Sequence, residues 1–177
     1  MNSLFPVEII ERPLTHNRVI ELFDYDDDTG LLIWKVRIAQ RIHIGDVAGS
    51  TTGRGYRDVE IEGKTYRLHR VIWFWKTGNW PEHQIDHEDT NKTNNRWKNL
   101  RPATNSKNQA NVSLKSNNTS GVKGVYRKKW RKKFKWAAII GVNGKRIHLG
   151  YRDTIEEAGE LYADAARKHF GEFARCS

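Results

Sequence analysis

Gln84-Ile85-Asp86-His87 opens the stretch around which the chain is organised, and asparagines follow it at positions 91, 94, 95, 99 and 108. Core packing by itself does not explain an acidic residue beside a histidine and then a run of asparagines. On a strand, Asp86 and His87 point to opposite faces, so they can carry different roles. Phosphodiester hydrolysis needs a group that takes a proton from water and a cation at the phosphate. We therefore predict a hydrolytic site in which Asp86 holds a cation and His87 is the general base.

The two expected ligands predict a hard cation. A carboxylate at Asp86 and an amide oxygen at Asn108 suit Mg²⁺, which keeps several waters and bridges to phosphate, whereas they are poor zinc ligands. The imidazole of His87 is a suitable base near pH 7. We expect one Mg²⁺ or Mn²⁺ in each active site.

The spacing of these residues is the specific part of the signal. Asn99 lies twelve residues after His87, and Asn108 nine residues further on. This spacing resembles the H-N-N form of the HNH homing endonucleases of phages and group I introns. The resemblance implies a ββα-metal fold with Asp86 as the first metal ligand and His87 as the general base. It also implies that Asn99 ties the loop together and orients the histidine, and that Asn108 is the metal ligand on the helix.

Each residue taken singly has an ordinary interpretation. An Asp-His pair is more often a surface salt bridge, and asparagines are common in loops and caps. A second stretch, Leu68-His69-Arg70-Val71 upstream of Gly78-Asn79-Trp80-Pro81, also resembles the HNH homing family. His69 is either a core or capping histidine or a phosphate contact, and Arg70 is a candidate phosphate clamp. Both are kept as candidate DNA-binding residues.

Charge and composition point to a polyanion as partner. The 177 residues carry a formal net charge of +10, and the basic character increases toward the C-terminus, which favours double-stranded DNA. The one cysteine, Cys176, allows neither a disulfide framework nor a zinc ribbon. Without a long apolar run or a signal segment, we expect no membrane association and a cytoplasmic protein in a bacterial or phage-infected cell, associated with the nucleoid.

The segments before the site predict a small antiparallel sheet and two helices. Thr15 can cap a short helix, the acidic stretch 23–30 is predicted to be a solvated turn, and a helix is expected over 69–76 up to Gly78. Alternating apolar residues predict strands over 31–36, 45–49, 56–61 and 64–68. After His83 a strand carries Asp86 and His87, and a helix over 105–111, capped by Thr104, carries Asn108.

The C-terminal third predicts a second unit. Residues 121–150 contain ten lysines and arginines and no acidic residue. Strands are expected over 124–127, 135–140 and 145–150, because Asn143-Gly144 is a strong hairpin signal. A capping box over 153–156 opens an amphipathic helix.

This second unit resembles the plant apetala-two/ethylene-response-factor DNA-binding domain. The matching residues are Gly124-Val125, Trp130, Lys135-Trp136-Ala137-Ala138, Arg146 to Gly150, and the helix from Asp153 to Ala166. The resemblance implies a three-stranded sheet that lies in the major groove. The candidate DNA contacts are Lys123, Tyr126, Arg127, Lys128, Trp130, Arg131, Lys135, Arg146 and His148. Because lysine replaces arginine at several of them, we expect the sheet to hold phosphates more than it reads bases.

The sequence thus predicts an α+β chain of two parts. Residues 14–112 form an N-terminal sheet and a ββα-metal nuclease with its HNH core at 66–112, residues 113–120 a linker, and residues 121–177 the DNA-binding domain. The predicted function is a homing-type endonuclease, borne by a phage or another mobile element, that acts as a monomer and nicks DNA. A non-catalytic transcription regulator on a decayed HNH scaffold is the alternative, and an RNA-directed or unspecific nuclease is a third interpretation.

Overall fold

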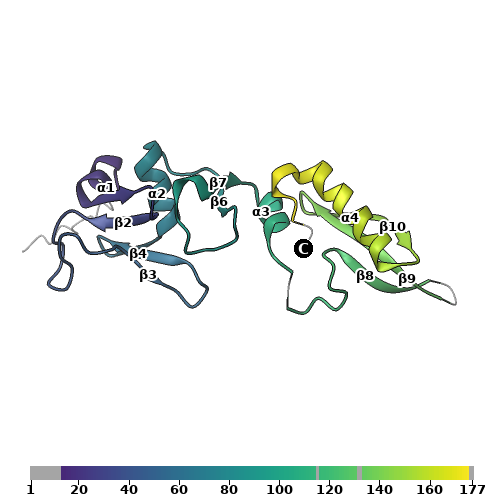
Figure 1. Cartoon of the computed structure of the whole chain (residues 1–177). Helices are drawn as coiled ribbons and strands as arrows, with labels where there is room; N and C mark the ends of the chain where they lie inside the picture. The colour runs from purple at the N-terminus through teal and green to yellow at the C-terminus, as the bar shows by residue number, and fades with distance from the viewer. Residues whose placement is uncertain (1–12, 115, 131–132, 176–177) are drawn as a thin grey trace, which may run out of the picture.

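The computed structural model describes residues 13–114, 116–130 and 133–175, and it confirms the α+β class, with small antiparallel sheets and a few helices. Two lobes lie side by side, and helix α3 lies between them (Figure 1). The predicted contact Arg131 and Cys176 lie outside the described residues, as does the side chain of Trp130. No helix of the described part is long and apolar enough to cross a membrane.

The N-terminal lobe begins with a capped helix and a hairpin. Helix α1 (His16–Leu22) starts where the Thr15 hydroxyl accepts a hydrogen bond from the Arg18 amide, as expected. The prediction of a turn over the whole acidic stretch was wrong. Residues Phe23–Asp26 form strand β1, antiparallel to β2 (Leu31–Trp34), and only the residues between them turn. Phe23 is fully buried, and this packing outweighs the low strand propensity of aspartate.

The second sheet of this lobe has the order β3-β4-β5, with β3 (Ser50–Thr51), β4 (Arg57–Ile61) and β5 (Lys64–Arg67). The predicted strand over 45–49 was wrong: Val47 makes one isolated bridge to Ile33, and the strand comes afterwards. Helix α2 (Leu68–Thr77) follows β5 and ends at Gly78, whose left-handed conformation caps it as predicted.

The predicted nuclease unit is a hairpin with a helix. Strand β6 (Gln84–His87) pairs antiparallel with β7 (Leu100–Ala103), and a long loop ending in a short 3₁₀ turn, η1 (Trp97–Asn99), joins them. Helix α3 (Asn105–Asn111) begins after Thr104, whose hydroxyl accepts from the Lys107 amide.

The C-terminal lobe is a three-stranded sheet covered by one helix. Its order is β10-β9-β8, with β8 (Val125–Trp130), β9 (Lys133–Val142) and β10 (Lys145–Arg152). Helix α4 (Ile155–Phe170) and the 3₁₀ turn η2 (Gly171–Phe173) follow. The capping box is displaced by one residue from its prediction, since Thr154 rather than Asp153 is the N-cap and accepts from the Glu157 amide.

Two hydrophobic cores meet at the nuclease hairpin. Ile85 and Leu100 belong to the core of the N-terminal lobe. Ala103 and Ala110 belong instead to the core formed by the C-terminal sheet and α4. The hairpin and α3 therefore connect the two lobes through packing as well as through the chain.

Gly30, in the turn between β1 and β2, packs closely against the loop that precedes β7. Its φ is +74°, and a Cβ there would lie 2.7 Å from the carbonyl carbon of Asn95 and closer still to the Arg96 amide nitrogen. We expect Gly30→Ala to lower the free energy of unfolding by about 2–4 kcal/mol, because backbone must move as well as adopt a strained φ. Gly63→Ala is the matched control, since its φ of +77° is similar but its Cβ would meet nothing within 4 Å. Chemical denaturation would measure both, and equal losses would contradict the packing argument.

Candidate nuclease site

Asp86 and His87 are the last two residues of β6, at the end of the hairpin where the loop to β7 begins. Pairing of Asp86 with Arg101 and of His87 with Leu100 fixes their register. Both side chains are buried, with 6% and 4% of their surface exposed. A buried carboxylate and a buried imidazole both need specific partners, because burial without them is costly.

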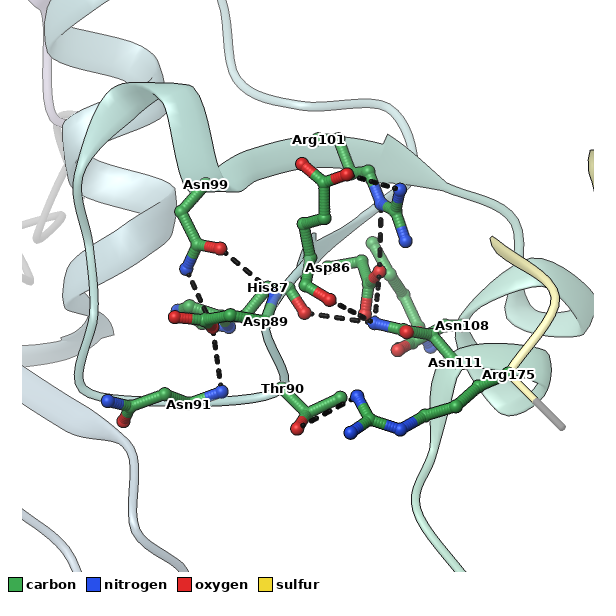
Figure 2. Close-up of polar contacts among 12 residues, drawn as sticks. Asp86, His87, Asp89, Thr90, Asn91, Asn99, Arg101, Asn108, Asn111 and Arg175 are labelled. Carbon is green, nitrogen blue, oxygen red and sulfur yellow. Dashed lines mark hydrogen bonds and ion pairs between the residues drawn. The ribbon is translucent and has the colours of Figure 1, made fainter. Parts of the chain in front are cut away.

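The partners of Asp86 come from β7 and α3. Its Oδ2 accepts hydrogen bonds from Arg101 Nε at 3.1 Å and from Asn111 Nδ2 at 2.9 Å, as Figure 2 shows. Asn111 also donates to the His87 carbonyl at 2.9 Å, so it links the helix to both site residues. Sequence reasoning did not identify Asn111. Its position three residues after Asn108 on one helix was the available signal, because such residues lie on neighbouring faces.

His87 is hydrogen-bonded by Asn95, which the sequence interpretation did not single out from the other loop asparagines. His87 Nε2 lies 3.0 Å from Asn95 Oδ1. An amide oxygen only accepts, so Nε2 carries the proton and Nδ1 holds the lone pair. Asn95 is itself buried, and its carbonyl accepts from the Tyr25 hydroxyl at 2.9 Å. Burial lowers the pKa of His87, against the smaller opposing effect of the Asn95 hydrogen bond, so its ring is neutral near pH 7.

Asn99 ties the loop rather than touching the imidazole. Its Nδ2 donates to Asp89 Oδ1 at 3.0 Å and its Oδ1 accepts from the Asp89 amide at 3.0 Å, as Figure 2 shows. Its Nδ2 also donates to the Asn94 carbonyl at 2.7 Å. These bonds hold the two ends of the loop between β6 and β7 together. The loop then presents Asn95 to His87.

Asn108 reaches the same pocket from α3. Its Nδ2 donates to Gln84 Oε1, so this bond uses the amide nitrogen of Asn108 and not its amide oxygen. Asp86, His87 and Asn108 line one pocket of about 350 Å³, together with Tyr56 and Lys92. Among the described residues, no group of three or more His, Cys, Asp or Glu side chains could hold a metal ion. A carboxylate and an amide oxygen are ligands that suit a hard cation such as Mg²⁺, which keeps most of its waters, better than they suit zinc.

The two upstream candidates lie behind the site. His69 is buried, and its ring lies against that of His87. Among the residues that the structure describes, none is a hydrogen-bond partner of its Nδ1. Arg70 donates to the carbonyls of Pro81 at 3.1 Å and His83 at 3.2 Å, so it fixes the chain that leads into β6. These bonds give Arg70 a structural explanation that the phosphate-clamp prediction did not include.

The register of the C-terminal sheet places the predicted DNA contacts. The helix α4 covers the face that carries Val125, Ala138 and Ile140. Residues paired across antiparallel strands lie on the same face of the sheet. The pairs that β9 makes with β8 and β10 therefore show which residues lie on the opposite, outward face. That outward face carries Tyr126, Lys128, Lys133, Lys135, Arg146 and His148.

Two predicted contacts do not belong to the outward face. Arg127 lies on the side of the sheet that faces α4, and its guanidinium stacks over the Phe134 ring at 4.6 Å. Lys123 precedes the sheet, and its Nζ donates to the carbonyls of Ala110 and Val112 at the end of α3. Near Tyr126 the sheet and residues 112–114 and 117–119 border a pocket of about 540 Å³.

The end of the chain packs back on the site. The Arg101 guanidinium lies 3.7 Å from the centre of the ring of Phe173, the last residue of η2. Arg175 Nη1 lies 3.4 Å from the Thr90 hydroxyl in the loop between β6 and β7. The side chain that pairs with Asp86 is therefore also a contact of the C-terminal lobe.

Comparison with known proteins finds a matching family and a similar phage protein. Residues 66–110 match the model of a family described as HNH endonuclease. The chain is also 34% identical over 113 residues to Protein 3.8 of Escherichia phage T7, an alignment that covers 63% of this chain and 91% of that protein. No solved structure gives a significant match.

The buried His69 makes stability depend on pH. Burial and then the charge on His87 lower the pKa of His69 to about 3, from 6.5 in the unfolded chain. Between these values the unfolded chain binds more protons, so the free energy of unfolding falls as the pH drops from about 6.5 toward 3, by up to about 1.4 kcal/mol per pH unit. We expect Tm to fall less steeply between pH 7 and 5 in His69→Phe than in the unchanged protein, as measured by calorimetry. Equal slopes would show that His69 takes up its proton freely in the folded state.

Proposed function

This chain belongs to the HNH endonuclease family, as a relative of Protein 3.8 of phage T7, and we propose that it hydrolyses phosphodiester bonds in double-stranded DNA as a homing-type enzyme. The observation that carries the proposal is the pocket of about 350 Å³ that Asp86, His87 and Asn108 share. Strand β6 and helix α3 bring a carboxylate, a neutral imidazole and an amide oxygen to one place.

His87 is the proposed general base. Its proton lies on Nε2, toward Asn95, so Nδ1 is the atom that takes the proton from the attacking water. The lowered pKa keeps this lone pair free near neutral pH. Asn99 acts indirectly, because it closes the loop that carries Asn95.

Asp86 and the amide oxygen of Asn108 are the proposed metal ligands. A bound Mg²⁺ or Mn²⁺ would supply positive charge at the scissile phosphate. Lys92 supplies a further cation, since its Nζ lies 4.7 Å from the centre of the Tyr56 ring at the rim of the pocket and donates to the Arg54 carbonyl at 3.1 Å. We assign Lys92 to a non-bridging oxygen of the phosphate, where negative charge grows during hydrolysis.

The C-terminal sheet is proposed to bind DNA as apetala-two/ethylene-response-factor domains do. Its outward face gathers Lys128, Lys133, Lys135 and Arg146 beside Tyr126, which is 49% exposed. Cations gathered on one face favour a polyanion as ligand. With one site in each chain, we propose a monomer that nicks one strand at a time.

The first experiment is cleavage of supercoiled plasmid, with nicked and linear products resolved. We expect nicking with Mg²⁺ or Mn²⁺, no nicking with EDTA, and none with His87→Ala, which should still bind DNA because its sheet is unchanged. Lys92→Ala should slow nicking at least about tenfold, as removal of one group that stabilises developing charge does. Lys98→Ala, which removes an exposed lysine of η1 that does not line the pocket, is the control.

The outcomes separate the proposal from its alternatives. Binding without cleavage under every metal condition would favour a non-catalytic DNA-binding protein. Faster cleavage of RNA than of duplex DNA would favour an RNA-directed nuclease. Nicking that persists in His87→Ala would refute the assignment of the base.

The role of the sheet has its own test. Replacing Lys128, Lys133 and Arg146 of the outward face by alanine should weaken binding and make the plot of log K against log salt shallower by roughly 2–3, about 0.9 for each phosphate that is no longer neutralised. The control removes three exposed cations elsewhere, Arg41, Lys98 and Lys168. Fluorescence anisotropy over a salt series would measure both. The same slope in the two variants would move the DNA-binding surface away from the sheet.

A further inference from the structure

His69 is a buried ionisable residue that the proposed chemistry does not use. It lies in the first turn of α2, only 6% of its surface is exposed, and its Nδ1 has no hydrogen-bond partner within the described part of the chain. Hydrogen bonding at that nitrogen therefore does not fix the ring. The side chain of His69 packs instead against the rings of Tyr56 and His87.

Three rings pack together at the back of the pocket. The rings of His69 and His87 meet edge to face, with centroids 5.1 Å apart and planes at 81°. The centre of the Tyr56 ring lies 5.6 Å from the centre of the His69 ring and 6.1 Å from the centre of the His87 ring. Tyr56 is held in turn by Lys92 and by the Arg67 guanidinium, which lies 5.0 Å from its ring centre.

His87 needs such a contact because its hydrogen bond alone does not orient it. The bond to Asn95 fixes one atom of the imidazole, Nε2, and leaves the ring free to turn about that point. The last torsion of a histidine side chain is soft, so hydrogen bonding at one nitrogen does not define the direction of the other. A second ring packed against His87 removes this freedom.

We infer that His69 is a positioning residue of the nuclease, whose ring fixes the plane of the His87 imidazole and thereby the direction of its Nδ1. The inference rests on the proposed function of His87 as the base. The neighbouring residues Val71 and Ile72 are fully buried in the core, so α2 holds His69 rigidly. Because burial keeps the His69 ring uncharged near neutral pH, its role is packing.

The test compares three variants of helix α2 in the full chain. His69→Ala removes the ring, and we expect kcat for plasmid nicking to fall at least about tenfold with KM little changed, because a small misplacement of a reacting group is costly while the DNA contacts are untouched. His69→Phe keeps a ring of similar size, and kcat should recover to within about threefold of the unchanged protein. Val71→Ala opens a cavity in the same helix away from His87, and below its Tm it should keep the original kcat.

NMR of the His87 ring gives a readout that does not depend on activity. The edge-to-face neighbour shifts the His87 ring proton signals, so these signals should move in His69→Ala and Val71→Ala should leave them in place. Unchanged His87 signals in His69→Ala, or a kcat in His69→Phe as low as in His69→Ala, would overturn the inference. If the unchanged protein does not nick DNA at all, the proposed function fails, and the NMR comparison still decides whether the His69 ring packs on the His87 ring, the contact on which the inference rests.

Discussion

The buried carboxylate of Asp86 ties the nuclease hairpin, helix α3 and the C-terminal lobe to one another. Its charge is compensated by Arg101 from β7 and by the amide of Asn111 from α3. Removing one partner of such a group leaves an uncompensated buried charge, which typically costs about 3–5 kcal/mol. The pairing therefore fixes the strand register and the position of the helix together. It also holds Arg101 where Phe173 of the C-terminal lobe stacks on it.

That arrangement gives the two lobes a physical connection at the pocket. The hairpin contributes Ile85 and Leu100 to one core, while Ala103 and Ala110 contribute to the other. Arg175 approaches the loop that carries the asparagines of the site. DNA held by the outward face of the sheet would thus be held by a lobe that already touches the nuclease.

The spacing of a few residues was enough to predict the nuclease unit from the sequence. It was not enough to predict the contacts within that unit. The helix after Thr104 follows from a local capping signal, whereas the hairpin and the loop-closing role of Asn99 were expected from the resemblance to HNH homing enzymes. The sequence does not indicate which asparagine faces His87, because Asn94 and Asn95 are neighbours in one loop. Only the closed path of that loop decides between them. The same holds for the strand at Phe23, where packing of a buried ring outweighs the acidic residues beside it.

Periodicity, residue type and spacing along the chain were enough to predict the α+β class, the position of the candidate site and the basic second unit, because each of these is a local property. Packing in three dimensions is what pairs Asn111 with Asp86, directs Arg70 and Lys123 to backbone carbonyls, and sets His69 against His87. Each of these contacts joins residues from different elements, so it depends on how helices and strands come together. Local sequence carries little information about that packing.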